Sequence, residues 1–183
     1  ACLRPPAAVA SAPPWCSAGG PGRLRPHWPG DLAGAGPWLP HLVSIGADPL
    51  LLGPIFTSQS HGYDTVTHRE IDDRLGVVAD FDALITAASA SNIGIVLDGA
   101  FAYVSHAFWR LTDPDENVDP WFLRDPTGQL VPWRVASLVT PDYRSTGYQS
   151  YVAHVRSFWL VRGVRGWVST PEGSGPADAW RNV

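Results

Sequence analysis

The spacing of hydrophobic positions changes along the chain, and each change predicts a different element. After Asp31, which can cap a helix, apolar residues follow helical spacing over residues 32–43. Pro37 and Pro40 interrupt this segment, because each lacks an amide donor and clashes with the preceding turn. The apolar run of residues 50–56 predicts a strand buried on both faces. The chain is therefore expected to begin as a broken helix followed by a strand.

The same alternation repeats further along the chain. Helical spacing returns over residues 81–88, and Asn92 and Gly94 end that helix. A second apolar run, residues 95–97, predicts another buried strand, which leads directly into Asp98. Helix and strand thus alternate, which is typical of an α/β fold with parallel strands.

A third helix and strand follow a long interruption. Residues 105–147 contain Pro, Asp and Trp without regular spacing, and we expect an irregular insert there. Helical spacing over residues 151–162 ends at Gly163, and residues 164–168 predict the last strand. Three strands are too few to close a barrel, so the predicted sheet has open edges.

The first segment differs in composition from the rest. Residues 1–29 are rich in Pro, Ala and Gly, which predicts an irregular arm before a folded region of residues 30–183. Cys2 and Cys16 lie in this arm and either form one disulfide or are two unrelated thiols. Because no apolar signal-peptide core precedes the small residues 7–12, we expect no intact signal peptide. The compartment stays open between cytoplasmic and secreted.

Charge and composition exclude some partners. The chain has 183 residues and a net charge of -4, which disfavours nucleic acids and anionic membranes. No apolar stretch reaches the ~18 residues of a membrane span. All 13 basic residues are arginines. The nine Trp residues suit either stacking on sugars or filling a core.

Asp98 is the first candidate for chemistry. A carboxylate at the end of an apolar strand is costly unless it is paired or close to solvent. It is either a site residue at the carboxyl end of a parallel strand or a cap for the following loop. The residue pattern alone does not separate these two interpretations.

A series of motifs identifies a family resemblance. They occur in order as Leu52-Gly53-Pro54-Ile55-Phe56, Ser60-His61-Gly62-Tyr63-Asp64, Ile71-Asp72-Asp73-Arg74-Leu75-Gly76, Asp80-Phe81-Asp82-Ala83-Leu84, Gly94-Ile95-Val96-Leu97-Asp98 and Gly163-Val164-Arg165-Gly166-Trp167. Together they resemble the α-amylase family of glycoside hydrolases, on its neopullulanase, cyclomaltodextrinase and maltogenic-amylase side. The resemblance spans about residues 30–167.

The resemblance implies a fold. The family is built on a (β/α)₈ barrel, so the strands near Leu50, Ile95 and Val164 would be its second, third and fourth. Residues 105–147 would be the small domain inserted after the third strand. We therefore expect residues 30–183 to be a partial α/β TIM barrel with an irregular insert.

The resemblance also implies a site. The family's retaining mechanism uses two carboxylates about 5 Å apart on an α-glycosidic bond. Tyr63 matches the aromatic residue that stacks on the sugar, and Asp64 matches its polar companion. Asp98 matches the aspartate that supports the catalytic arginine.

Other positions depart from the family pattern. The expected Asn-His pair is Ala102-Tyr103, so the calcium-binding Asn is missing and Tyr103 stands where a sugar-contacting His is expected. The arginine position is Val168 and the nucleophile position is Thr170. Valine cannot orient a carboxylate, and threonine without a base is a weak nucleophile. Glu172 is a poor replacement, because a proline separates it from Thr170.

We expect no metal or cofactor. The six histidines show no zinc-ligand spacing. The acidic segment 113–119 is either a calcium loop or a solvated turn, and its prolines and missing loop glycine favour the turn.

Three functional hypotheses follow. The chain belongs to an α-glucan hydrolase, it is a non-catalytic glucan-binding remnant, or it is an unstable truncated piece. With no intact catalytic set, we expect no activity from this chain alone. The expected partner is an α-glucan or maltooligosaccharide, with self-association possible through the open barrel edges.

Overall fold

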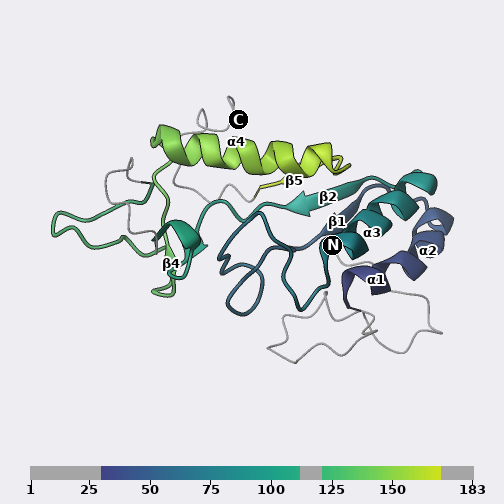
Figure 1. The fold of residues 1–183 in the computed structure, drawn as a ribbon, viewed down its shortest axis with the longest axis horizontal. Coiled ribbons are helices and arrows are strands. Elements are labelled where there is room, and N and C mark those ends of the chain that lie inside the picture. Colours follow the sequence, from purple (N-terminus) through teal and green to yellow (C-terminus); the bar gives the residue numbers. More distant parts are fainter. Residues whose placement is uncertain (1–29, 112–120, 170–183) are drawn as a thin grey trace.

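The computed structural model describes residues 30–111 and 121–169 (Figure 1). Its elements in chain order are α1 (Leu32–Ala35), η2 (Gly36–Trp38), α2 (Leu39–Ser44), β1 (Leu50–Leu52), α3 (Val78–Ala90), β2 (Ile95–Asp98), β3 (Val104–Ser105), η3 (Trp109–Leu111), β4 (Leu138–Val139), α4 (Thr146–Val161) and β5 (Gly166–Val168). The predicted arm 1–29, with Cys2 and Cys16, lies outside the described residues. So do the acidic segment 113–119 and Thr170 and Glu172.

The first helical segment is broken as expected. The Asp31 side chain accepts a hydrogen bond from the Gly34 amide and caps α1. A 3₁₀ turn, η2, then separates α1 from α2. Pro37 and Pro40 each stand in the first turn of the element they occupy, where a missing amide donor is tolerated.

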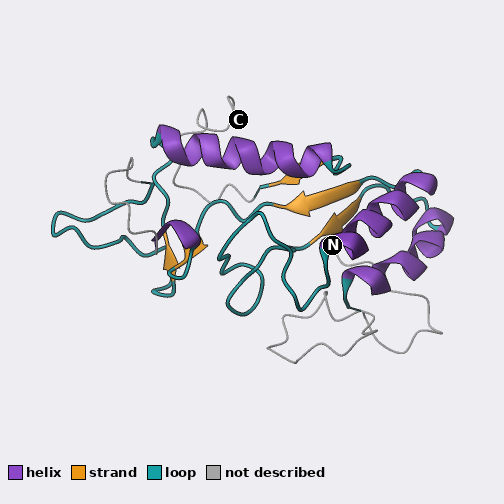
Figure 2. Ribbon diagram, viewed as in Figure 1, coloured by secondary structure: helices purple, strands orange, loops and turns teal. Residues whose placement is uncertain are grey.

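Within the described residues, the main sheet contains three parallel strands in the order β1-β2-β5, which confirms the predicted partial α/β barrel. Leu50 pairs with Ile95 and Leu97 with Trp167. In Figures 1 and 2 the arrows of β1 and β2 point toward the end of the molecule that carries long loops and the β3–β4 pair. The carboxyl ends of the strands therefore face those loops.

The two faces of the sheet differ in burial. Leu52 and Leu97 face the helices and are buried. Leu51 and Val168 lie on the opposite face and are each 44% exposed. The prediction of a strand buried on both faces over residues 50–56 was therefore wrong. The strand ends at Leu52, and its second face is partly open to solvent.

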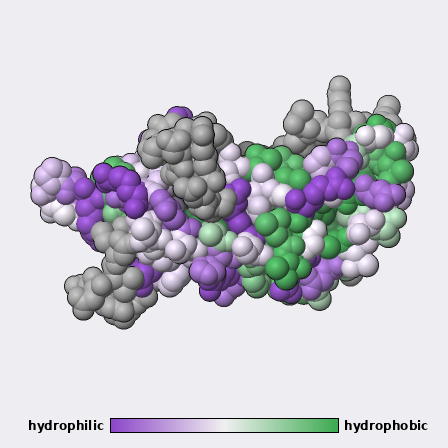
Figure 3. Space-filling model, turned by 90° about the horizontal axis from the view of Figure 1, so that it is seen from above, coloured by the Kyte–Doolittle hydropathy of each residue, from purple (hydrophilic) through white to green (hydrophobic). Residues whose placement is uncertain are grey.

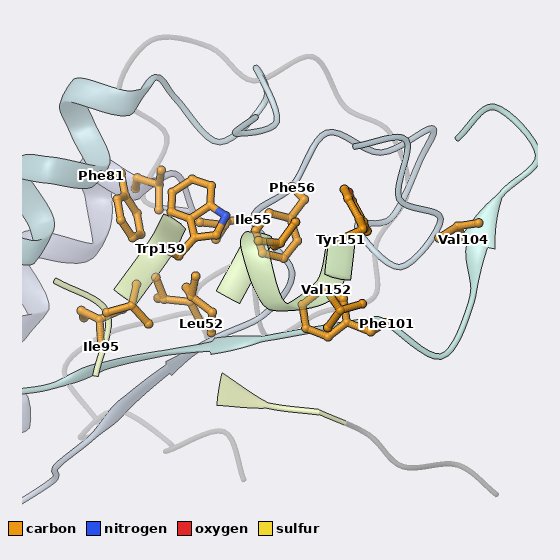
Figure 4. Close-up of a cluster of buried hydrophobic side chains, with 14 of the residues drawn as sticks. Leu52, Ile55, Phe56, Phe81, Ile95, Phe101, Val104, Tyr151, Val152 and Trp159 are labelled. Carbon is orange, nitrogen blue, oxygen red and sulfur yellow. The ribbon is translucent and has the colours of Figure 1, made fainter. Parts of the chain in front are cut away.

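Helices α3 and α4 bury a shared aromatic core against the sheet (Figure 4). The Trp159 ring of α4 meets the Phe81 ring of α3 at 5.1 Å between centroids and the Phe56 ring at 5.8 Å. The buried residues of α4 recur at helical spacing, namely Tyr148, Tyr151, Val152, Val155 and Trp159. Gly163, with φ of 101°, ends α4 as predicted, because its left-handed backbone excludes most side chains.

The insert is more ordered than its sequence suggested. Val104 and Ser105 pair antiparallel with Val139 and Leu138, so β3 and β4 form a small second sheet at the two ends of the insert. Both Tyr143 and Tyr148 donate hydrogen bonds to the Phe101 carbonyl, at 3.2 and 2.6 Å. These bonds join the end of the insert and the start of α4 to the segment that follows β2.

The surface of the insert end differs in polarity from that of the helical half. Hydrophilic residues predominate on the insert end, whereas hydrophobic residues gather over the helical half (Figure 3). Phe158 and Val161 of α4 are 41% and 89% exposed. Among the described helices, none combines the length and apolar character needed to cross a bilayer.

Candidate functional site at the carboxyl end of the sheet

The loop after β1 carries Tyr63 to the carboxyl end of the sheet. Gly62 has φ of 93°, and a side chain there would approach the Pro54 carbonyl at 3.2 Å. This left-handed residue turns the chain immediately before Tyr63. The Tyr63 ring is 38% exposed, so part of it stays open to solvent.

Tyr63 and Asp98 meet across the sheet edge. The Tyr63 hydroxyl donates a hydrogen bond of 3.0 Å to Asp98 Oδ2. Partial burial, together with the neighbouring Asp98 carboxylate and Tyr103, raises the pKa of Tyr63 to about 12. The phenol therefore stays protonated at neutral pH and acts as a donor to the carboxylate. Asp98 thus lies at a cluster of candidate site residues, and not in a loop cap.

Asp98 is under-satisfied. Among the described residues, its buried Oδ1 atom has no hydrogen-bond partner. In the strand register, Asp98 stands opposite Val168, whose side chain offers no donor. Burial raises the pKa of Asp98, and the Tyr63 hydrogen bond only partly opposes this shift. A guanidinium at position 168 would supply the missing donors.

Asp64 accepts hydrogen bonds from residues of its own loop. It is 7% exposed, and its carboxylate accepts bonds from the Ser60 amide at 3.1 Å, the Ser60 hydroxyl at 2.6 Å and the His61 amide at 3.2 Å. Burial works against ionisation, but these hydrogen bonds outweigh it and lower the pKa of Asp64. Both oxygens therefore hold the turn that presents Tyr63, and the sugar contact predicted for Asp64 stays untested.

Tyr103 lies within electrostatic range of Tyr63, whereas Ala102 is buried in a small apolar cluster. The charge interaction of Tyr103 with Tyr63 places the two phenols near each other. Its ring also packs on Trp133, at 5.6 Å between centroids. Ala102 is buried with Trp133 and Leu138. An alanine methyl in an apolar cluster offers no oxygen to a calcium ion.

Sequence reasoning missed the residues that shape this loop. Asp72 and Arg74 form a partly buried ion pair next to it, with 2.5 Å between Arg74 Nη2 and Asp72 Oδ2. Both lie in a motif of the family resemblance, residues 71–76, which does not by itself indicate their role. The signal available was an acidic residue two positions before an arginine, which also occurs at Asp142 and Arg144.

The described residues hold no cluster of three or more His, Cys, Asp or Glu side chains arranged for a metal ion. The chemistry that the site can offer is an exposed aromatic ring, two phenol hydroxyls and one carboxylate. Such a set suits contacts with the ring face and hydroxyl groups of a sugar.

The parallel α/β sheet and the polar cluster at its carboxyl end define a class, an enzyme-type barrel domain of which three strands are seen. The family model "Alpha amylase, catalytic domain" matches residues 16–139. Because this match covers more than half of the chain, the protein belongs to the α-amylase family of glycoside hydrolases.

Individual relatives agree with this family. An amylopullulanase from Thermoanaerobacterium saccharolyticum is 27% identical over 187 residues, covering 82% of this chain and 15% of the relative. A cyclic α-maltosyl-(1→6)-maltose hydrolase from Arthrobacter globiformis has a TM-score of 0.77 at 26% identity, over 88% of this chain and 42% of its own. An α-amylase from Lactobacillus plantarum has a TM-score of 0.73 at 26% identity, over 82% and 37%. The chain thus spans less than half the length of these proteins.

Proposed function

We propose that this chain supplies part of the α-glucan-binding cleft of an α-amylase-family glycoside hydrolase, and that alone it binds glucan without cleaving it. The observation that carries the proposal is the exposed Tyr63 ring, held by Asp98 at the carboxyl end of the sheet. A ring in this position can pack on the apolar face of a pyranose. A similar solved structure, named as a hydrolase of cyclic α-maltosyl-(1→6)-maltose, supports the same ligand class.

The absence of cleavage follows from the residues beside Asp98. Val168 stands opposite it in the register, where the family pattern places an arginine. The nucleophile position, Thr170, lies outside the described residues, but threonine lacks the carboxylate that a retaining mechanism needs. We also propose that no calcium is held at Ala102 and that residues 105–147 serve as the family's inserted small domain.

Hydrolysis is tested directly. Purified chain is incubated with soluble starch, cyclodextrin, pullulan and maltotriose, and released reducing ends are measured against a heat-killed sample. We expect no release above that control. Turnover that Asp98→Ala abolishes would contradict the proposal.

Binding is tested by calorimetry with maltooligosaccharides. We expect Tyr63→Ala to weaken binding about tenfold, because no aliphatic side chain replaces a stacked ring. Phe158→Ala is the matched control, because Phe158 is a similarly exposed aromatic residue on α4, at 41%. Equal affinity for the native chain and Tyr63→Ala would remove the binding role from this site.

A second proposal concerns self-association. Strands β1 and β5 each pair with β2 alone, so within the described residues each has one free edge. Leu51 and Val168 add exposed apolar surface to the partly open face of the sheet. Free edges beside apolar residues favour pairing between chains. We expect oligomers or aggregates by light scattering, and a monodisperse monomer with one sharp thermal transition would contradict this.

A further inference from the structure

Arg74 joins the two ends of the loop that carries Tyr63. Its Nε donates to Asp72 Oδ1 at 2.6 Å, and Nη2 donates to Asp72 Oδ2 at 2.5 Å. Nη2 also donates to the Ser58 carbonyl at 3.2 Å and to the Ser58 hydroxyl at 2.5 Å. Nη1 donates to the Ser60 carbonyl. One guanidinium therefore holds two backbone carbonyls that come just before the turn at Gly62.

Ser58 completes the connection. Its amide and hydroxyl each donate to Asp72 Oδ2 at 3.0 Å, while the hydroxyl oxygen accepts from the Gly62 amide at 3.1 Å. A serine hydroxyl has one hydrogen and two lone pairs. All three are used, by Asp72, Arg74 and Gly62. The position of Gly62, and so of the next residue, Tyr63, is fixed from beneath the loop.

We propose that the Asp72–Arg74 pair is a positioning clamp, which holds Tyr63 against Asp98 so that its ring can receive an α-glucan. Neither residue needs to touch the sugar, because both act through Ser58, Ser60 and Gly62. The sugar part of this inference rests on the proposed function. The positioning part does not, because the Tyr63–Asp98 contact exists in the protein alone.

The chain contains a matched control. In Asp142 and Arg144 the same spacing gives the same bonds, with Nε to Oδ1 at 2.9 Å and Nη2 to Oδ2 at 2.9 Å. The Arg144 side chain is 76% exposed, against 27% for Arg74. Arg144→Gln therefore removes an equivalent ion pair without disturbing the Tyr63 loop.

The test compares Arg74→Gln with Arg144→Gln in the full chain. Tyrosine is labelled with ¹³C, the Tyr63 signal is assigned with Tyr63→Phe, and its phenol is titrated. We expect the pKa of Tyr63 to fall from about 12 toward its ordinary 10.0 in Arg74→Gln, and to stay unchanged in Arg144→Gln. Among the described residues, Asp98 and Tyr103 act on the pKa of this phenol and the His61 ring packs near it, and both variants keep all three.

Calorimetry with maltoheptaose supplies the second measurement. We expect Arg74→Gln to weaken binding about tenfold, the size of one lost aromatic contact. Adding Tyr63→Ala to Arg74→Gln should then cost little more, because both changes remove the same interaction. Fully additive losses, or a Tyr63 pKa unchanged in Arg74→Gln, would overturn the clamp.

Two further outcomes are also decisive. If the native chain binds no maltoheptaose, the proposed function fails, while the phenol titration still decides whether the clamp exists. If Arg74→Gln does not fold, Ser58→Ala replaces it. That variant removes the hydroxyl between Asp72, Arg74 and Gly62 but keeps the ion pair. It is expected to lower the pKa of Tyr63 in the same direction, and no change would overturn the inference.

Discussion

A carboxylate lies at each end of the main sheet, and the pKa values of the two groups are shifted in opposite directions. At the amino end, Asp48 accepts two bonds from Arg165 Nη1, at 2.7 and 2.6 Å, and a third from the Gly94 amide at 2.9 Å. The hydrogen bond from Arg165, then that from Gly94, lowers the pKa of Asp48. At the carboxyl end, Asp98 has one bond from Tyr63, and burial raises its pKa.

This difference separates a cluster that stabilises the sheet from the site that we propose binds the glucan. The Asp48 cluster joins residues just before all three strands, and so it ties their starts together. Within the part of the chain that the structure describes, Asp98 binds the Tyr63 hydroxyl and keeps one buried oxygen unpaired. Unsatisfied polar groups are costly in a folded protein and concentrate at sites. The amino end therefore serves the fold, and the carboxyl end carries the site that we propose binds the glucan.

The largest effect is expected from truncating Trp159, which belongs to the core that both ends of the sheet share. Trp159→Ala leaves a cavity between Phe81 and Phe56 and deletes the bond from Trp159 Nε1 to the His68 carbonyl. We expect a loss of about 3–5 kcal/mol in unfolding free energy by denaturant titration. Phe158→Ala, its exposed neighbour on α4, should cost far less. Similar losses for both variants would show that the core does not support the sheet as described.

His68 links stability to pH. Its ring is fully buried among aromatic side chains, and burial lowers its pKa from 6.5 to about 4. The unfolded chain therefore takes up the proton first, and stability falls as the pH drops from 6.5 toward 4. At most, this loss lowers the free energy of unfolding by about 3 kcal/mol.

Thermal unfolding across this pH range checks the prediction. His68→Gln should flatten the dependence, whereas His106→Gln, at an exposed site bonded to the Ala136 carbonyl, should keep it. A native chain whose stability does not change over the range would contradict the prediction.

Val168→Arg makes the carboxyl end resemble the amino end. The side chain at position 168 is 44% exposed and stands opposite Asp98, so a guanidinium can reach the unpaired oxygen. We expect the pKa of Asp98 to fall below its ordinary value. The free energy of unfolding should rise by only about 1 kcal/mol, because the new ion pair is partly solvated. NMR titration of Asp98 is the measurement, with Val168→Leu as the control. An Asp98 pKa that stays raised would contradict the predicted contact.

The smallest effect is expected at the amino end. Arg165→Gln removes a pair that is exposed on both sides, at 52% and 42%. We expect a small drop in melting temperature and a rise in the pKa of Asp48 toward its ordinary value of 3.8. Arg162→Gln, which breaks the exposed pair with Asp82, is the control and should leave Asp48 unchanged. No change in Asp48 would show that Arg165 does not set its pKa.

Periodicity alone predicted the helices well, because α3 and α4 bury one continuous face. It overextended β1, because an apolar run does not show whether the second face of a strand is covered. The pairing of Val104 with Val139 could not be predicted, because two-residue strands leave no alternation to detect. In the site, Tyr63 and Asp98 came from the family resemblance, whereas the clamp did not. Asp72–Arg74 and Asp142–Arg144 share one local pattern, and only the three-dimensional contacts separate them.

The hydrogen bonds to the Phe101 carbonyl allow the insert to vary in length. Its two lone pairs receive Tyr143, at the end of the insert, and Tyr148, at the start of α4. The excursion that leaves the sheet after β2 is thus tied back beside its own point of departure. A loop closed at its base can lengthen, shorten or be exchanged without shifting the elements on either side, because loop length costs little once the ends are fixed. Phe101 marks the boundary at which such grafting would leave the strands in register.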